Sequence, residues 1–286
     1  MNDRNSETMK EAIQSVIREM MDRVIDNALY KKPFSSKDYR EAKPLYAALV
    51  PDEIFKGSHF ERKFVTPFGK VWEKLAIIAA QNGLGYAELN YKINEKIEEG
   101  RLNRITEVLN RLEHPEPGKM RVQPNWNEEL SYILKGRGRK IPVTVVCDVY
   151  AENIVTGDRY AFEIKAPLPN SDQTKASKEK LFKLYNSMEP SVISEAYFAL
   201  AYNPRGNKEN YDWSPPKRWF NMIEDPVVLI GNELWDKLGG QGTYQALIRA
   251  VNELSQEYKP RIYREFLGIE PPDFDRDFQL PEQDVE

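Results

Sequence analysis

The stretch from Ile141 to Pro169 places the tightest constraint on the fold. Residues 141–151 are dense in β-branched side chains, and residues 159–165 alternate in character. Between them, residues 153–158 (Asn-Ile-Val-Thr-Gly-Asp) supply the residue types that favour tight turns. Two strand-forming runs joined by a short turn predict a β-hairpin.

Charged side chains gather on one face of this hairpin. Side chains repeat every two residues along a strand, so Glu163 and Lys165 point to the same face, and correct register brings Asp148 beside them. Two carboxylates about 4 Å apart repel by roughly 4 kcal/mol at an effective dielectric of about 20, so the cluster needs a proton or a cation. A hard divalent metal such as Mg²⁺ meets that need, and water bound to it can attack phosphorus.

The order of these charged residues resembles a known motif. Asp148 followed by Glu163-Ile-Lys165 is similar to the D…(D/E)-x-K motif of the PD-(D/E)xK nuclease superfamily. Glu-x-Lys also occurs at 41–43, 61–63 and 257–259, but only the copy at 163 follows a β-branched strand that carries an aspartate. The alternative is an exposed cross-strand ion pair, which would contribute only about 0 to 1 kcal/mol.

A further carboxylate lies in a segment that precedes the hairpin. In residues 64–80, Thr66-Pro67 predicts a helix start, and the apolar spacing predicts a buried helix that ends before Asn82-Gly83. Glu73 lies in the middle of this helix. The resemblance implies that such a helix contributes a glutamate to the metal site; the alternative is a helix-surface charge paired with a neighbouring lysine.

The remaining segments show either helical or strand patterns. Helical spacing is found at residues 7–30, 36–50, 86–112, 128–134, 170–183 and 243–266, and strand patterns at 194–202 and 227–230. This order resembles the αβββαβ core of the superfamily, with helical additions at both ends and one core strand not placed. We therefore expect a mixed α/β (α+β) fold. Its expected parts are a helical N-terminal region (1–60), a catalytic and DNA-recognition domain (61–269) and an acidic tail (270–286).

Cationic and amide side chains cluster in three segments near the hairpin or at a strand end. A loop at 135–140 with four cations and two glycines precedes the first strand, a lysine-rich helix follows the second, and the loop at 203–208 ends a predicted buried strand. Such groups suit contacts to phosphates and base edges, and a solvated surface is the alternative for each. The candidate DNA-binding residues are Arg137, Arg139, Lys140, Asn170, Gln173, Lys175, Lys178, Asn203, Arg205 and Lys208.

Composition excludes some classes of protein. The net charge of −4 argues against a nucleic-acid binder, but residues 270–286 carry −6, which leaves +2 for residues 1–269. One cysteine and two histidines exclude an intramolecular disulfide and a zinc site. No apolar run approaches the roughly 20 residues of a membrane span, so we expect a soluble, cytoplasmic protein with no membrane partner.

Three segments extend the resemblance beyond the superfamily. Residues 162–173, the phrase Phe-Gly-x-x-Trp-Glu at 68–73 and the loop at 202–206 are similar to type II restriction endonucleases, in particular the Tde-type family associated with GGNCC sites. The similarity covers roughly residues 60–240.

This resemblance implies a Mg²⁺-dependent, site-specific deoxyribonuclease that acts on double-stranded DNA. Asp148 and Glu163 would bind the metal, Glu73 would assist as a further catalytic and metal-binding residue, and Lys165 would position the attacking water. A palindromic site cut on both strands implies a homodimer with two-fold symmetry. The alternatives are a structure-selective repair or recombination nuclease of the same superfamily and, in a different class, a non-catalytic helical binding protein.

Overall fold

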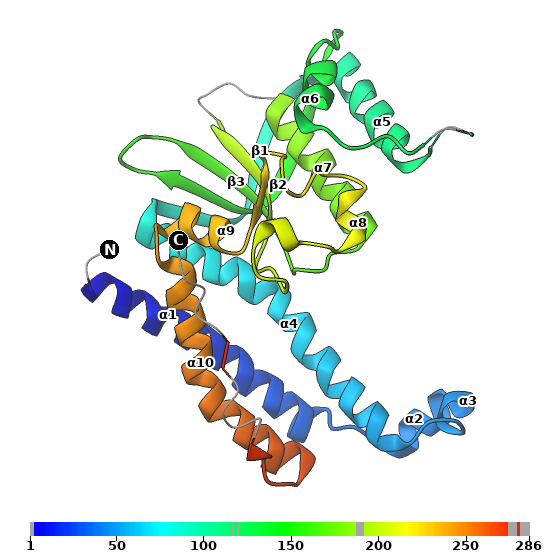
Figure 1. Ribbon diagram of the computed structural model, residues 1–286, viewed down its shortest axis with the longest axis vertical. Helices are drawn as coiled ribbons and strands as arrows, with labels where there is room; N and C mark the ends of the chain where they lie inside the picture. The colour runs from blue at the N-terminus through cyan, green and yellow to red at the C-terminus, as the bar shows by residue number, and fades with distance from the viewer. Residues whose placement is uncertain (1–2, 116, 119, 187–191, 274–278, 281–286) are drawn as a thin grey trace. The chain divides into compact units, whose positions relative to one another are not determined.

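The computed structural model describes the chain except for residues 1–2, 116, 119, 187–191, 274–278 and 281–286. The chain divides into two compact units (Figure 1). One comprises residues 76–244 and contains the β-sheet; the other comprises residues 2–75 and 245–286 and is helical. Most of the expected acidic tail lies outside the described residues. No described helix is long and apolar enough to cross a membrane.

A single five-stranded sheet forms the centre of the first unit. Its strands run in the order β1-β2-β3-β4-β5, antiparallel from β1 to β3 and parallel from β3 to β5. The strands are β1 (Gly85–Glu98), β2 (Lys140–Asn153), β3 (Arg159–Lys165), β4 (Glu195–Leu200) and β5 (Val228–Ile230). The parallel step from β3 to β4 requires a crossover, which α7 (Ser171–Asn186) supplies.

The predicted hairpin is confirmed as β2 and β3. Asn153 closes its turn by accepting hydrogen bonds on Oδ1 from the backbone N–H groups of Val155 and Thr156. Gly157 follows with a φ of +78°, a conformation that glycine adopts without steric cost. The turn residues that the sequence offers therefore fix the register of the strands.

The helix expected at residues 86–112 is wrong, because its first half is strand β1 and only α5 (Glu99–Glu113) is helical. The less exposed positions of β1 recur every second residue, at 87, 89, 91, 93, 95 and 97. Charged residues between them give the segment the composition of a helix, while its period is that of a strand. This strand is the one that the sequence did not place.

Helices α5, α6 and α7 build the core of the unit against the sheet (Figure 1). The first turn of α6 (Trp126–Leu134) is capped as predicted, because Asn125 Oδ1 accepts a hydrogen bond from the N–H of Glu128 at 3.2 Å. Trp126 then stacks on Phe182 of α7, with ring centroids 4.7 Å apart. Two short helices, α8 (Ser214–Lys217) and α9 (Asn232–Gly239), and a 3-10 turn (Lys208–Asn210) complete the unit.

The second unit is built from helices at both ends of the chain. Its elements are α1 (Asp3–Asp26), η1 (Asn27–Lys31), α2 (Ser36–Ala42), α3 (Pro44–Ala47), α4 (Asp52–Gly83, up to residue 75), α10 (Thr243–Ile262, from residue 245) and η3 (Tyr263–Leu267). Ion pairs join α1 to α10, among them Arg18 with Glu257 at 3.1 Å and Asp22 with Arg261 at 3.0 Å. The sequence of helix, three strands, helix and strand agrees with the expected αβββαβ core and its helical additions.

The predicted helix start at Thr66-Pro67 is also wrong, because α4 runs through it without a break. A proline inside a helix removes one hydrogen bond and costs about 3 kcal/mol. Three aromatic rings one helical turn apart span this position: Phe64 and Phe68 lie 5.1 Å apart, and Phe68 and Trp72 lie 4.9 Å apart. We attribute the continuity of α4 to these contacts and to the helix-favouring sequence on both sides.

A buried ion pair joins α6 to α7. Lys178 is 0% exposed and its Nζ lies 2.5 Å from Oε2 of Glu129, which is 4% exposed. The ammonium also donates to the carbonyl of Trp219 and lies 4.9 Å from the ring centroid of Phe220. Burial lowers the pKa of Lys178 and raises the pKa of Glu129, so each charge depends on the other for compensation.

We predict that Lys178→Met lowers the free energy of unfolding by about 3 to 5 kcal/mol, because it leaves the Glu129 carboxylate buried without a counter-ion. The double variant Lys178→Met/Glu129→Leu should recover most of that loss, since replacing both charges with apolar groups is often neutral. Urea unfolding of the single and double variants measures the coupling. Losses that simply add would show that the two side chains do not depend on each other.

Candidate active site

The site lies where the β2–β3 ladder ends. The last paired residues are Val149 and Phe162, and the next pair, Asp148 and Glu163, is not joined through the backbone. Instead Oδ2 of Asp148 accepts the backbone N–H of Ile164 at 2.9 Å. β3 meanwhile remains paired with β4 as far as Lys165. The two strands therefore separate at the charged residues. There the Asp148 carboxylate, in place of a backbone carbonyl of β2, accepts the hydrogen bond from β3.

The predicted meeting of Asp148, Glu163 and Lys165 is present in the structure. The ammonium of Lys165 lies 2.7 Å from Oδ2 of Asp148 and 3.3 Å from Oε2 of Glu163. It also donates to the backbone carbonyl of Ile164 at 3.2 Å. Two carboxylates and one carbonyl thus converge on a single cation.

A second ammonium, which the candidate residues did not include, completes the cluster. Lys180 extends from α7, and its Nζ lies 2.7 Å from Oε1 of Glu163. It is one of four lysines on this helix, and the sequence does not reveal which of them faces the hairpin. The burial of Ser177, Lys178 and Leu181 reflects the rotation of the helix, which only the packing decides. All four charged side chains come from residues 148–180.

Burial sets the electrostatics of the cluster. Glu163 is only 2% exposed, and burial, together with the charge of Asp148, raises its pKa even though Lys165 and Lys180 act to lower it. Burial also acts to lower the pKa of Lys165, but the charges and hydrogen bonds of Glu163 and Asp148 outweigh it and the pKa is raised. Next to the site, burial raises the pKa of the Cys147 thiol to about 12, so this cysteine is not a nucleophile at neutral pH.

The donor set suits a hard divalent cation. Among the described residues no group of three or more Asp, Glu, His and Cys side chains gathers for metal binding, so the protein would offer two carboxylates and the Ile164 carbonyl. Mg²⁺ takes oxygen ligands and keeps several waters, which makes one or two carboxylates sufficient. The same three oxygens already attract one cation, the Lys165 ammonium.

Glu73, the further candidate ligand, lies on α4 in the helical unit. It is partly buried, and its role at the metal site stays a prediction.

The basic loop before β2 is held in place by backbone contact. A Cβ on Gly100 would lie 2.2 Å from the carbonyl oxygen of Arg137, and one on Gly136 would lie 2.5 Å from the backbone nitrogen of Arg101. Arg137 is exposed and lies 3.4 Å from Glu98, and Arg139 and Lys140 are exposed as well. The three cations are therefore presented on an anchored segment.

The candidates on α7 have structural partners. Asn170 and Gln173 form a reciprocal cap: Asn170 Oδ1 accepts the N–H of Gln173 at 2.8 Å, and Gln173 Oε1 accepts the N–H of Asn170 at 3.2 Å. Lys175 pairs with Glu113 at 2.5 Å. The complete burial of Lys178 contradicts the prediction that it lies on a basic face open to DNA.

The loop after β4 is internally bonded. Oδ1 of Asn203, a buried residue, accepts the N–H of Arg205 at 2.9 Å, and its amide donates to the carbonyl of Asn207 at 2.5 Å. Lys208 pairs with Glu233 at 3.0 Å. The Arg205 side chain is 60% exposed and pairs with Asp212 at 3.2 Å, so it is the most accessible of the three candidates here.

Comparison with known proteins gives one family and several relatives. The family described as type II restriction endonuclease, HinfI, matches residues 9–255. The type II restriction enzyme HgiEI of Herpetosiphon aurantiacus is 27% identical over 264 residues, which cover 88% of this chain and 91% of that enzyme. The type II restriction enzymes HgiBI and HgiCII of the same organism are each 27% identical, over 81% and 79% of this chain and 84% and 82% of their own lengths.

We predict that Mg²⁺ raises the melting temperature of the protein, because a ligand that binds only the folded state stabilises it by about 2.7 kcal/mol at 100 times its Kd. Asp148→Asn should abolish the shift, since it removes one of the two carboxylates. Thermal unfolding with and without Mg²⁺ measures the effect, and Asp158→Asn in the hairpin turn serves as the matched control. A shift of equal size in both variants would place the bound metal elsewhere.

Proposed function

The chain belongs to the HinfI family of type II restriction endonucleases, and on that premise we propose that it hydrolyses phosphodiester bonds of double-stranded DNA at a specific sequence, with Mg²⁺ as cofactor. The observation that carries this proposal is the convergence of Asp148, Glu163 and Lys165 at the point where β2 and β3 separate. An exposed cross-strand ion pair, the alternative for these residues, does not account for a glutamate that is 2% exposed.

In this proposal the two carboxylates, with Glu73 as a further candidate, hold the metal. When bound, Mg²⁺ supplies a water of lowered pKa and neutralises charge on the departing oxygen. Lys165 holds the attacking water by hydrogen bonding. In the metal-free protein the charges of Glu163 and Asp148 raise the pKa of Lys165, so its ammonium offers hydrogen-bond donors and a positive charge to that water.

Lys180 has a separate role in the proposed chemistry. Its ammonium contacts the Oε1 oxygen of Glu163, while Lys165 contacts Oε2. Lys180 therefore fixes the orientation of the carboxylate without occupying Oε2, the oxygen that shares the Lys165 ammonium with Asp148. We assign it as a positioning residue for Glu163.

DNA contacts are assigned to the exposed cations that remain. Arg137, Arg139 and Lys140 suit the phosphate backbone, and Arg205 suits a base edge, because arginine to guanine is the commonest specific contact. The site GGNCC follows from the resemblance to the Tde-type family. A two-fold symmetric homodimer acting in the cytoplasm completes the proposal.

We predict discrete fragments when the purified protein is incubated with unmethylated phage DNA in Mg²⁺, and none in EDTA. Lys165→Ala should lower the cleavage rate by at least about 10²- to 10³-fold, as expected for the loss of a group that stabilises charge in the transition state. Gel electrophoresis gives the rates, and the fragment ends give the site. A smear in place of bands would favour the structure-selective repair nuclease, and intact DNA with a folded protein would favour the non-catalytic binding protein.

We predict that Lys180→Gln lowers the cleavage rate by about 10- to 100-fold, the range typical for residues that orient a metal ligand. Lys183→Gln is the matched control, because Lys183 lies on the same helix and pairs with Glu179 at 2.6 Å. Raising the Mg²⁺ concentration should recover part of the activity of Lys180→Gln, and a melting temperature equal to that of the parent protein would exclude a folding defect as the cause of the loss. Equal rates for both variants would remove Lys180 from the site.

A further inference from the structure

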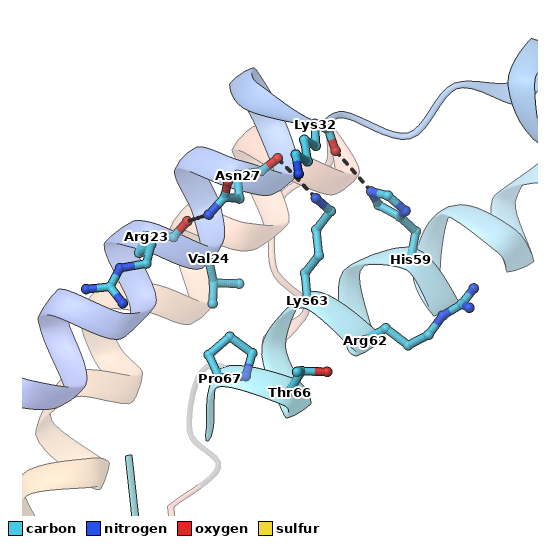
Figure 2. A pocket seen from close by; sticks show the side chains of 9 residues that line it. All are labelled: Arg23, Val24, Asn27, Lys32, His59, Arg62, Lys63, Thr66 and Pro67. Carbon is cyan, nitrogen blue, oxygen red and sulfur yellow. Dashed lines mark hydrogen bonds between the residues drawn. The ribbon is translucent and has the colours of Figure 1, made fainter. Parts of the chain in front are cut away.

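The helical unit contains a pocket of about 540 Å³ that the proposed chemistry does not use. It lies between the end of α1 with η1 and the middle of α4, and all its lining residues fall within residues 23–67 (Figure 2). Its volume falls in the range of small-ligand sites, roughly 300 to 1,000 Å³. Figure 2 shows His59 and Lys63 extending from α4 toward the segment that carries Asn27 and Lys32.

The lining of this pocket is basic. Of the nine residues that line it, none is an aspartate or a glutamate. Five are arginine, lysine or histidine: Arg23, Lys32, His59, Arg62 and Lys63. Four of these five are arginine or lysine, so the lining sets four positive charges against no carboxylate.

Three of these basic side chains contact neutral oxygens. Lys63 Nζ lies 3.5 Å from the Asn27 carbonyl, Arg62 Nε lies 3.4 Å from the Ser58 carbonyl, and a ring nitrogen of His59 lies 3.1 Å from the Lys32 carbonyl. Within the part of the chain that the structure describes, Arg23 is the one lining side chain paired with a carboxylate, Glu19 at 2.5 Å. Carbonyl groups are neutral acceptors, so these contacts leave the net positive charge of the pocket lining unchanged.

The charges also act on one another. Burial and the charge of Lys32 lower the pKa of Lys63. A bound anion would relieve this repulsion. It would also offer Arg62 and Lys63 a charged acceptor, whereas their present contacts to carbonyl oxygens are long, at 3.4 and 3.5 Å. Lys32 and Arg62 are exposed, so an anion can reach the pocket from solvent.

We propose that this pocket binds a phosphate of the DNA backbone and so anchors the substrate outside the cleavage site. The inference rests on the proposed function. Lysine and arginine without a counter-ion suit phosphate contacts, which carry no sequence information.

The test measures binding of short DNA duplexes by fluorescence anisotropy in EDTA, at salt concentrations between about 50 and 200 mM. One duplex contains GGNCC and the other lacks it. Each lost phosphate contact reduces the slope of log affinity against log salt by about 0.9. Arg62→Gln/Lys63→Gln should therefore reduce the slope by about 1 to 2 per protomer, to the same extent on both duplexes.

Two further variants separate a phosphate contact from other effects. Arg62→Lys/Lys63→Arg keeps both charges and should keep the slope of the parent protein. Lys37→Gln/Lys43→Gln removes two charges from exposed positions in the same unit and should leave the slope unchanged. A slope loss of equal size in this control would overturn the inference, because it would reveal a general charge effect. Melting temperatures verify that every variant is folded.

The outcomes distinguish this inference from the proposed function. If the parent protein cleaves DNA in Mg²⁺ and the Arg62→Gln/Lys63→Gln variant keeps its slope, the pocket does not contact DNA and the function stands. If the parent neither binds nor cleaves DNA, both proposals fail. Calorimetric titration with inorganic phosphate adds a further arm: saturable binding with an unchanged DNA slope would show a site for free phosphate and overturn the DNA assignment.

Discussion

The burial of the Glu163 carboxylate is the constraint on which the arrangement of the sheet unit depends. A carboxylate that has lost its water must be compensated, and here one ammonium comes from its own strand and the other from α7. The contact with Lys180 ties the crossover helix to the hairpin. The contact with Asp148 through Lys165 closes the gap where the β2–β3 ladder ends. The carboxylate oxygens of Asp148 and Glu163 that bind the Lys165 ammonium are also the oxygens that would bind a hard cation. The same atoms therefore serve local stability and the proposed chemistry.

Local patterns in the sequence predicted the parts of the structure that local contacts decide. The hairpin of β2 and β3 follows from residue types and a turn of six residues, so its register brings Asp148, Glu163 and Lys165 together without help from distant segments. The cap at Asn125 is equally local, since its side-chain oxygen accepts the N–H of Glu128, three residues further along the chain. These are interactions whose partners lie within one hairpin or one helical turn.

The sequence did not predict features that long-range packing decides. β1 has the charge of a solvated helix, and its pairing with the far side of β2 is what makes it a strand. The rotation of α7 places Lys178 in the core and Lys180 beside Glu163, although the two residues look alike in the sequence. The path of α4 through Pro67 is a different case, because its aromatic contacts are local, one helical turn apart, while the Thr66-Pro67 pair has the sequence of a helix start.

The charged cluster is drawn entirely from residues 148–180, and this closeness along the chain bears on the order of folding. Closing a short loop costs less conformational entropy than closing a long one, so β2, β3 and α7 can associate before more distant segments join them. β1 must wait for α5 and α6 to fold between it and β2. We therefore expect the charged side chains of the site to come into contact early in folding, in a partly folded chain whose sheet still lacks the edge strand β1.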